Sequence, residues 1–257
     1  MKWLRTIIVF DQGNIVSSSD WSAFHDSYAA CIKAIDHPRG TGKFTLREKL
    51  ALPDGQWVRN GVPYLRSEFL NHMVGSTMWR AEGMVGLEKT RDQPVMKLYP
   101  SLQDHREEIT SNFGGFDFVT TGPQGTRIAI EWETGNISSS HRSMNKLAIA
   151  LSSSIIDVGV LIVPSRALYE HLTDRIGNIG ELSGYLALWE GLKTTVKRGL
   201  LAITVVEHDE LSVDPKIPHL RAGADGRARK KTALAPKTLK KARTIQSKPL
   251  RPKGPLE

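Results

Sequence analysis

The feature that most constrains the fold is a nearly unbroken apolar run at 155–163, in which Asp157 is the only charged residue. Alternate side chains of a strand point to opposite faces of the sheet, so a strand made of this run would need cover on both faces. The run therefore predicts a central strand, ended by Pro164, within a sheet that carries helices on both sides. A second apolar run at 200–206 predicts another buried strand.

The segments around these runs alternate between helical and strand patterns. Helices are expected from Ser19 or Asp20 to about Asp36, from Pro63 toward Trp79, and at 101–110, 138–151, 166–175 and 179–190. Strands are expected at 43–46, 116–121 and 126–133, with turns at Asn60-Gly61 and at 122–125. This order predicts a mixed-sheet α/β domain flanked by helices.

Charge divides the chain of 257 residues into a body and a tail. Residues 221–257 hold 12 basic and 2 acidic residues, whereas residues 1–220 hold 23 basic and 25 acidic ones. We therefore expect one folded domain over 1–220 and a basic, flexible arm over 221–257. Such an arm attracts phosphate groups and favours binding to a polyanion, although a solvated tail that only aids solubility is the alternative.

The remaining composition favours a cytoplasmic protein. Cys31 is the only cysteine, which excludes an internal disulfide framework and fits a reducing compartment. No stretch approaches the roughly 20 apolar residues that a membrane span requires, so no membrane partner is expected.

The candidate chemistry lies at the end of the strand predicted at 126–133. Glu131 and Glu133 project to the same face, with carboxylates roughly 7 Å apart, while Ile128, Ile130 and Trp132 project into the core. Asp117 adds a third carboxylate if the two predicted strands pair. Clustered carboxylates repel one another, and a divalent cation with a preference for oxygen ligands, such as Mg²⁺, relieves that repulsion. Such a centre can hydrolyse phosphodiester bonds. An exposed strand face with ordinary glutamates is the alternative.

The residues that follow carry a resemblance to a known family. The stretch Glu131-Trp132-Glu133-Thr134-Gly135-Asn136-Ile137-Ser138-Ser139-Ser140-His141-Arg142-Ser143-Met144-Asn145-Lys146-Leu147 resembles the active-site and recognition segment of BamHI-type restriction endonucleases. The similarity continues in patches from about residue 25 to 231, including Leu172-Thr173-Asp174-Arg175 and Gly223-Ala224-Asp225-Gly226.

That resemblance implies a catalytic site. The family belongs to the PD-(D/E)XK nucleases, with an αβββαβ core and Mg²⁺-dependent cleavage by a homodimer at a palindrome. It implies that Asp117 and Glu131 hold metal, that Glu133 acts as general base, and that Glu82 is a fourth acidic residue, also at the metal. The chain departs from the pattern in a longer stretch between Glu82 and Asp117, and in a Gly-Gly-to-Asp spacing shorter by one residue, which weakens both assignments.

The resemblance also implies a DNA-reading surface and a target. The matching major-groove positions are Asn136, Ser138, Arg142, Asp174 and Arg175, and the matching minor-groove positions on the arm are Gly223 and Asp225. Arginine reads guanine, aspartate accepts from cytosine and asparagine reads adenine. Identical residues at these positions imply the same target, GGATCC. Each residue also has a structural alternative: Asn136 or Ser138 could cap a helix, and the charged residues could be ordinary surface side chains.

Two other functions remain open. One is a sequence-specific DNA-binding protein without catalysis, and the other is a nuclease of the same fold with a different target. A restriction endonuclease also implies a cognate methyltransferase in the same cell, with no direct contact between the two proteins.

Overall fold

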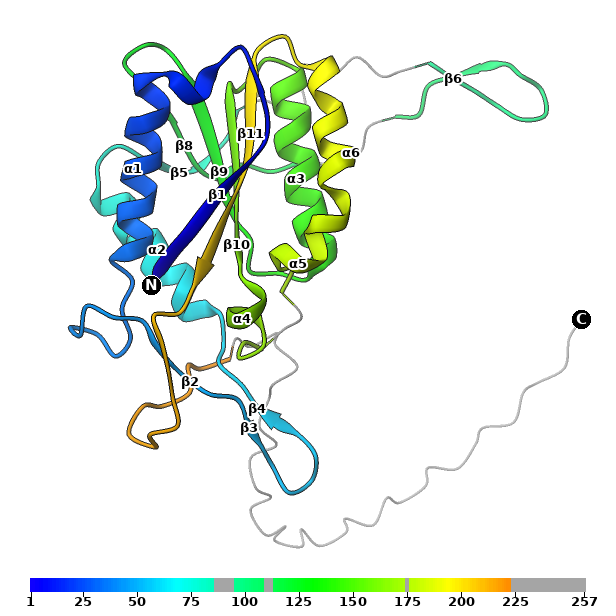
Figure 1. Cartoon of the computed structure of the whole chain (residues 1–257). Coiled ribbons are helices and arrows are strands. Elements are labelled where there is room, and N and C mark those ends of the chain that lie inside the picture. The colour runs from blue at the N-terminus through cyan, green and yellow to red at the C-terminus, as the bar shows by residue number, and fades with distance from the viewer. Residues whose placement is uncertain (86–94, 109–112, 174–175, 223–257) are drawn as a thin grey trace, which may run out of the picture.

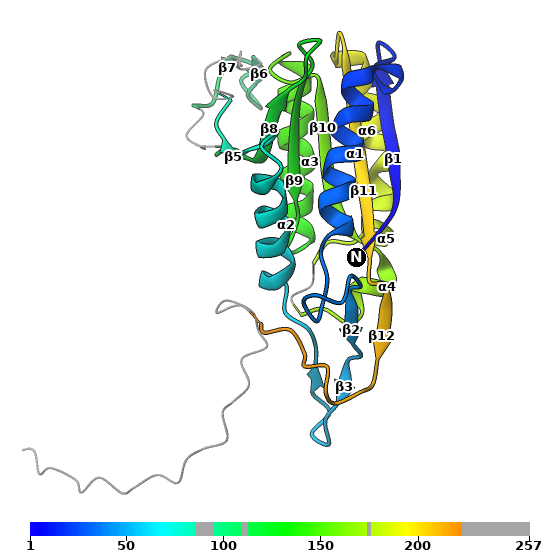
Figure 2. The ribbon, with the colours of Figure 1, turned by 90° about the vertical axis from the view of Figure 1, so that its left-hand side faces the viewer.

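The structure is a computed structural model that describes residues 1–85, 95–108, 113–173 and 176–222. Its centre is a six-stranded mixed sheet in the order β1-β11-β10-β9-β8-β5. The strands of this sheet are β1 (Lys2–Gln12), β5 (Arg80–Gly83), β8 (Phe116–Thr121), β9 (Arg127–Trp132), β10 (Val158–Pro164) and β11 (Gly199–Glu207). In Figure 2 the strands run from β5 and β8 at one edge to β1 at the other.

Helices cover both faces of this sheet, as Figure 1 shows. On one face lie α1 (Ser19–Lys33) and α2 (Pro63–Gly75), and on the other lie α3 (Ile137–Ser152) and α6 (Leu186–Gly191). Two apolar cores result, one on each side, and every residue of β10 is buried. The predicted mixed α/β fold with a central strand covered on both faces is confirmed.

Short elements complete the described residues. They include the paired strands β2 (Thr45–Arg47) and β12 (Glu210–Ser212), the hairpins β3 (Leu50–Ala51) with β4 (Trp57–Val58) and β6 (Met96–Lys97) with β7 (Asp104–His105), and the helices α4 (Arg166–Tyr169) and α5 (Ile179–Leu182). Among the described residues, none of the helices combines the length and the apolar character needed to traverse a bilayer.

Several local predictions were wrong. The segment predicted as a polar helix at 101–110 contains β7 instead, and the helix predicted at 166–175 ends early, because α4 stops at Tyr169. The helical segment predicted at 179–190 is confirmed as the consecutive helical elements α5, a 3-10 turn at Ser183–Tyr185, and α6. The edge strand β1 was not predicted. The cap of α1 is Ser18, whose hydroxyl accepts from the Trp21 N–H at 3.2 Å.

Asp20, one of the two expected caps, has a different role. Its buried carboxylate accepts hydrogen bonds from the backbone N–H groups of Gln124 and Thr126 at 3.1–3.2 Å. It therefore fastens α1 to the turn between β8 and β9, the two strands that carry the candidate site.

Candidate metal and DNA-binding site

Antiparallel pairing of β8 and β9 brings Asp117 to Glu131. Phe118 pairs with Ile130, and the same register carried one residue further sets Asp117 beside Glu131. The Asp117 side chain turns toward β9, where its Oδ2 accepts a hydrogen bond from the Trp132 N–H at 2.8 Å. The predicted pairing of these two strands is confirmed, and it places two of the three expected carboxylates together.

Glu131 is a buried carboxylate on the face of β9 that α3 covers. Its side chain is 10% exposed and forms an ion pair through Oε1 with the ammonium group of Lys146 on α3. Burial raises the pKa of Glu131 to about 7, against the opposing charge of Lys146, and the charges of Asp117 and Glu133 add to the rise. The site therefore disfavours accumulated negative charge unless a cation balances it.

Glu133 follows β9 directly and is also buried. Its Oε1 accepts from the Gly135 N–H at 2.5 Å, and its Oε2 accepts from the Ser143 hydroxyl of α3 at 3.2 Å. Burial raises the pKa of Glu133, and the hydrogen bonds from Gly135 and Ser143 oppose that rise. A carboxylate held in this way has a fixed orientation, and its raised pKa makes it a better proton acceptor than an ordinary glutamate.

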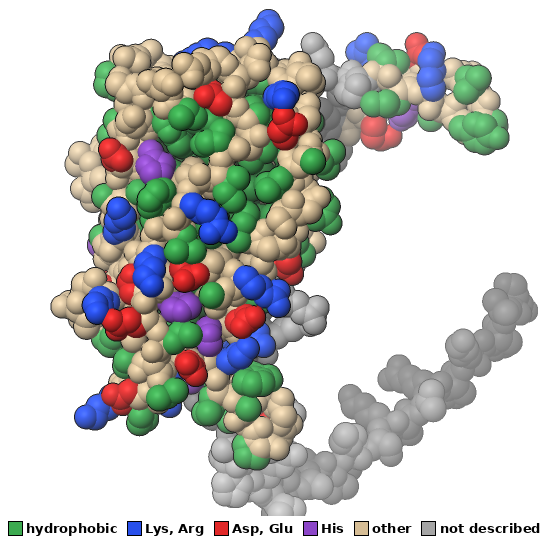
Figure 3. Space-filling view, in the orientation of Figure 1, with side chains coloured by type: hydrophobic (Ala, Val, Ile, Leu, Met, Phe, Trp, Pro, Cys, Tyr) green, Lys and Arg blue, Asp and Glu red, His purple; other side chains and the backbone are tan. Residues whose placement is uncertain are grey.

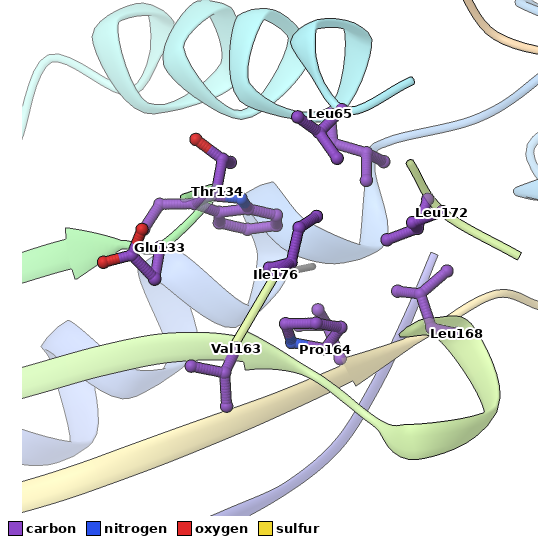
Figure 4. Close-up of a pocket in the computed structure, with 11 residues that line it drawn as sticks. Leu65, Glu133, Thr134, Val163, Pro164, Leu168, Leu172 and Ile176 are labelled. Carbon is purple, nitrogen blue, oxygen red and sulfur yellow. The ribbon is translucent and has the colours of Figure 1, made fainter. Parts of the chain in front are cut away.

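A small apolar pocket adjoins Glu133, as Figure 4 shows. Leu65, Leu168, Leu172 and Ile176 line it, whereas the carboxylate oxygens of Glu133 point away from Leu168 and Leu172. The stem of Glu133 thus packs against apolar residues while its charged end reaches the start of α3.

Glu82 lies on β5, the next strand beyond β8. Its neighbours Ala81 and Gly83 pair with Phe118 and Phe116, which sets Glu82 beside Asp117. Glu82 is exposed, and its φ of 49° is in the left-handed region. The order β5-β8-β9 thus places Glu82, Asp117 and Glu131 on three adjacent strands.

Two basic side chains neutralise this acidic region. The Arg66 guanidinium of α2 lies 3.6 Å from Oδ1 of Asp117, and Lys146 pairs with Glu131. Among the described residues, no three His, Cys, Asp or Glu side chains are arranged as a ready metal cluster. The donor chemistry nevertheless fits a hard divalent cation, because Oδ1 of Asp117 and the buried Oε1 of Glu131 are carboxylate oxygens that face the cationic groups of Arg66 and Lys146.

The described DNA-reading candidates gather at the start of α3. Asn136, Ser138 and Arg142 are all exposed there. Asn136 is the N-cap of α3, since its side chain accepts from the Ser139 N–H at 3.1 Å, so the structural alternative for this residue is realised. Asp174, Arg175, Gly223 and Asp225 lie outside the described residues, as does nearly all of the predicted arm.

Sequence reasoning missed the residues that support the carboxylates, namely Arg66, Ser143 and Lys146. Ser143 and Lys146 are three positions apart on α3 and share one helical face, which meets Glu133 and Glu131. The one available signal was the presence of polar residues on the buried side of an otherwise apolar helix.

Comparisons with known proteins identify the family of this chain. The sequence model of the family "Restriction endonuclease BamHI" matches residues 1–227, and the chain belongs to the BamHI restriction endonuclease family. It is 48% identical over 104 residues to the type II restriction enzyme OkrAI of Oceanobacter kriegii, covering 40% of this chain and 52% of that protein. It is 49% identical over 65 residues to the type II restriction enzyme BamHI of Bacillus amyloliquefaciens, covering 25% of this chain and 30% of that protein.

These alignments span about half, or less, of the length of the curated relatives. A solved structure, the restriction endonuclease BglII complexed with a DNA 16-mer, aligns with 80% of this chain and 79% of its own, at a TM-score of 0.49 and 7% identity.

Proposed function

We propose that this chain is a type II site-specific deoxyribonuclease that hydrolyses phosphodiester bonds of double-stranded DNA. The supporting observation is that Asp117 near the start of β8 lies beside Glu131 and Glu133 at the end of the antiparallel strand β9. This end of the strand pair adjoins the exposed first turns of α3. Membership of the BamHI restriction endonuclease family supports the same activity.

The proposed chemistry assigns separate roles to the carboxylates. Asp117 and Glu131, with Glu82 from the adjacent strand, would hold Mg²⁺, which when bound polarises the phosphate and stabilises the leaving oxygen. Glu133 accepts the proton of the attacking water. The hydrogen bonds from Gly135 and Ser143 fix its orientation for that transfer.

The proposed target is the palindrome GGATCC, bound by a homodimer so that each subunit reads one half. Arg142 has the donors to recognise guanine O6 and N7, and Asn136 and Ser138 lie on the adjacent exposed turn. We assign Asp174 and Arg175 to the same major-groove contacts, and Gly223 and Asp225 to the minor groove.

The arm proposed at 221–257 supplies phosphate contacts. The body at 1–220 has nearly balanced charge, and in the view of Figure 3 its basic and acidic side chains are interspersed. Affinity for the DNA backbone would therefore depend on the arm and fall steeply with salt. The cytoplasm is the expected compartment, where a cognate methyltransferase would protect the host's own sites.

Paired duplexes test the activity and the target together. The protein is incubated with Mg²⁺ and two duplexes that differ by one base pair within GGATCC, and with EDTA in a parallel reaction. We expect cleavage of the GGATCC duplex alone, and only with Mg²⁺. An intact GGATCC duplex would reject the proposal, whereas equal cleavage of both duplexes would retain the nuclease and reject the target.

A variant separates cleavage from binding. Glu133→Ala removes the proposed general base while leaving the exposed side chains of α3 in place, so it should bind the GGATCC duplex without cutting it. If the unaltered protein also binds without cutting, the protein is a DNA-binding protein without catalysis.

A further inference from the structure

Lys146 is a buried cation at the acidic site that the proposed mechanism does not use. Its side chain is 10% exposed and extends from α3 to the end of the β8–β9 pair where Gly115 and Glu131 lie. Long basic side chains are seldom buried without a partner, because desolvation of the ammonium group is costly. The contacts of Lys146 therefore explain why it is tolerated there.

Three contacts surround its ammonium group. Nζ forms the ion pair with Oε1 of Glu131, donates a hydrogen bond to the Gly115 carbonyl at 2.8 Å, and lies 4.6 Å from the centre of the Phe116 ring. Gly115 and Phe116 directly precede Asp117. One side chain thus joins α3 to the two segments that carry Asp117 and Glu131.

The position of the Lys146 ammonium group, and not only its charge, affects how a metal ion can bind. It contacts Oε1 of Glu131, one of the oxygens that the proposed function assigns to the divalent cation. A carboxylate oxygen that already contacts an ammonium group must exchange that partner, or share it, when a metal ion binds. The two cations therefore act on the same buried oxygen.

We propose that Lys146 is a positioning residue that serves as the internal counter-ion of the acidic site, holding Glu131 in place in the metal-free protein and competing with the divalent cation for it. This inference rests on the proposed metal-dependent function. It assigns Lys146 no contact with DNA and no role in proton transfer.

The test measures metal binding through thermal unfolding of the full chain, without DNA. Wild type, Lys146→Met and Lys146→Arg are titrated with Mg²⁺ from an EDTA-treated start, and the Mg²⁺ concentration at half-maximal rise in Tm is recorded. Lys146→Met should unfold at lower temperature than wild type in EDTA, and its half-maximal Mg²⁺ concentration should fall about tenfold, since one close charge commonly changes such equilibria by at least that factor. Lys146→Arg keeps the charge and should stay near the wild-type midpoint.

Lys193→Met is the matched control, because Lys193 forms an exposed ion pair with Glu190 away from the site. It should leave the midpoint unchanged. An unchanged or higher midpoint in Lys146→Met, with wild type responding to Mg²⁺, would overturn the counter-ion role and leave the metal-dependent function standing. A wild-type protein whose Tm does not respond to Mg²⁺, and which does not cleave DNA, would instead overturn the proposed function itself and this inference with it.

A double-mutant cycle covers the case in which Lys146→Met does not fold without metal. Glu131→Gln removes the negative charge, so adding Lys146→Met to it should lower Tm in EDTA by much less than Lys146→Met lowers it in wild type. Equal losses in the two backgrounds would show that Lys146 acts only through its contacts with Gly115 and Phe116, which would overturn the inference.

Discussion

The two faces of β9 are built on opposite principles. On the face toward α1 and α2, Ile128, Ile130 and Trp132 join a continuous apolar core. On the face toward α3, Ala129 joins the second core but Glu131 and Glu133 bury carboxylates near Lys146 and Ser143. The first face contributes stability through apolar burial, whereas the second places charges where desolvation is costly. The difference is the one expected if the α3 face carries out the proposed chemistry at the expense of stability.

The largest expected effect is on the cleavage rate and comes from the α3 face of β9. Glu133→Gln keeps the size of the side chain but cannot accept the proton, so the cleavage rate should fall about 10²- to 10⁴-fold. The free energy of unfolding should stay equal or rise, because a buried charge is removed. Single-turnover cleavage and chemical denaturation of the same preparation check both values, and a marked loss of stability would erase the contrast between the faces.

The apolar face should respond in the opposite way. Ile130→Ala leaves a cavity in the core between the sheet and the two helices, and should lower the free energy of unfolding by about 2–5 kcal/mol. Cleavage per folded molecule should change little.

Ile8→Ala is its matched control, because Ile8 is 39% exposed on the edge strand β1. It should cost less than about 1 kcal/mol. Equal losses for the two variants, measured by urea denaturation, would contradict the role of the α1–α2 face as the stability core.

A smaller effect is expected at the start of α3. Arg142→Ala should reduce discrimination between GGATCC and a one-base variant by about 1–3 kcal/mol, the value of one bidentate base contact. Competition binding with Ca²⁺ in place of Mg²⁺ measures it. Arg166→Ala, which changes an exposed arginine of α4, should leave discrimination unaltered, and an unchanged preference in Arg142→Ala would remove Arg142 from the reading surface.

The smallest effect is expected at the opposite end of β9, where a partly buried carboxylate is paired. Asp157 accepts hydrogen bonds from the Arg127 side chain at 2.9 and 3.2 Å and from its backbone N–H at 2.9 Å. Burial acts to raise the pKa of Asp157, but the hydrogen bonds from Arg127 and the nearby charge of Arg198 outweigh it, so the pKa lies below its usual value.

This depressed pKa has a definite sign for stability. The ionised Asp157 stabilises the folded protein above the unfolded-state pKa of about 3.9, and that contribution is lost as pH falls through the lower folded-state pKa. Asp157→Asn should therefore cost about 1 kcal/mol near pH 7, since both arginines are half exposed, and less in acid. Thermal unfolding of both proteins between pH 7 and pH 3 measures this difference in stability. A difference that stays constant over that range would contradict the pairing.

The central sheet was predictable because its strands carry strong local signals. The apolar run that became β10 and the turn between β8 and β9 fixed the neighbouring strands, and the alternation in β9 correctly separated Glu131 from Ile130. The edge strand β1 was missed, because a short apolar run at the start of a chain does not distinguish a strand from a helix. The helix predicted at 101–110 was wrong because polar residues beyond Pro100 support a turn and a short strand equally well.

The site was predictable only as far as the carboxylates. Their spacing along β9 and the pairing with β8 follow from strand geometry, and the structure confirms the proximity of Asp117 and Glu131. Lys146 and Arg66 could not be found in this way, because they reach the site from helices whose packing depends on the whole fold. The roles of all four carboxylates and of the DNA-reading residues remain predictions.

Digestion of a long DNA of known sequence is the measurement that most directly probes whether the α3 face of β9 is a cleavage centre. With Mg²⁺, wild-type protein should yield only the fragments bounded by GGATCC sites, while Glu133→Gln should leave the DNA intact. Wild-type protein that leaves the DNA whole, or a Glu133→Gln variant that cuts as fast as wild type, would contradict the account.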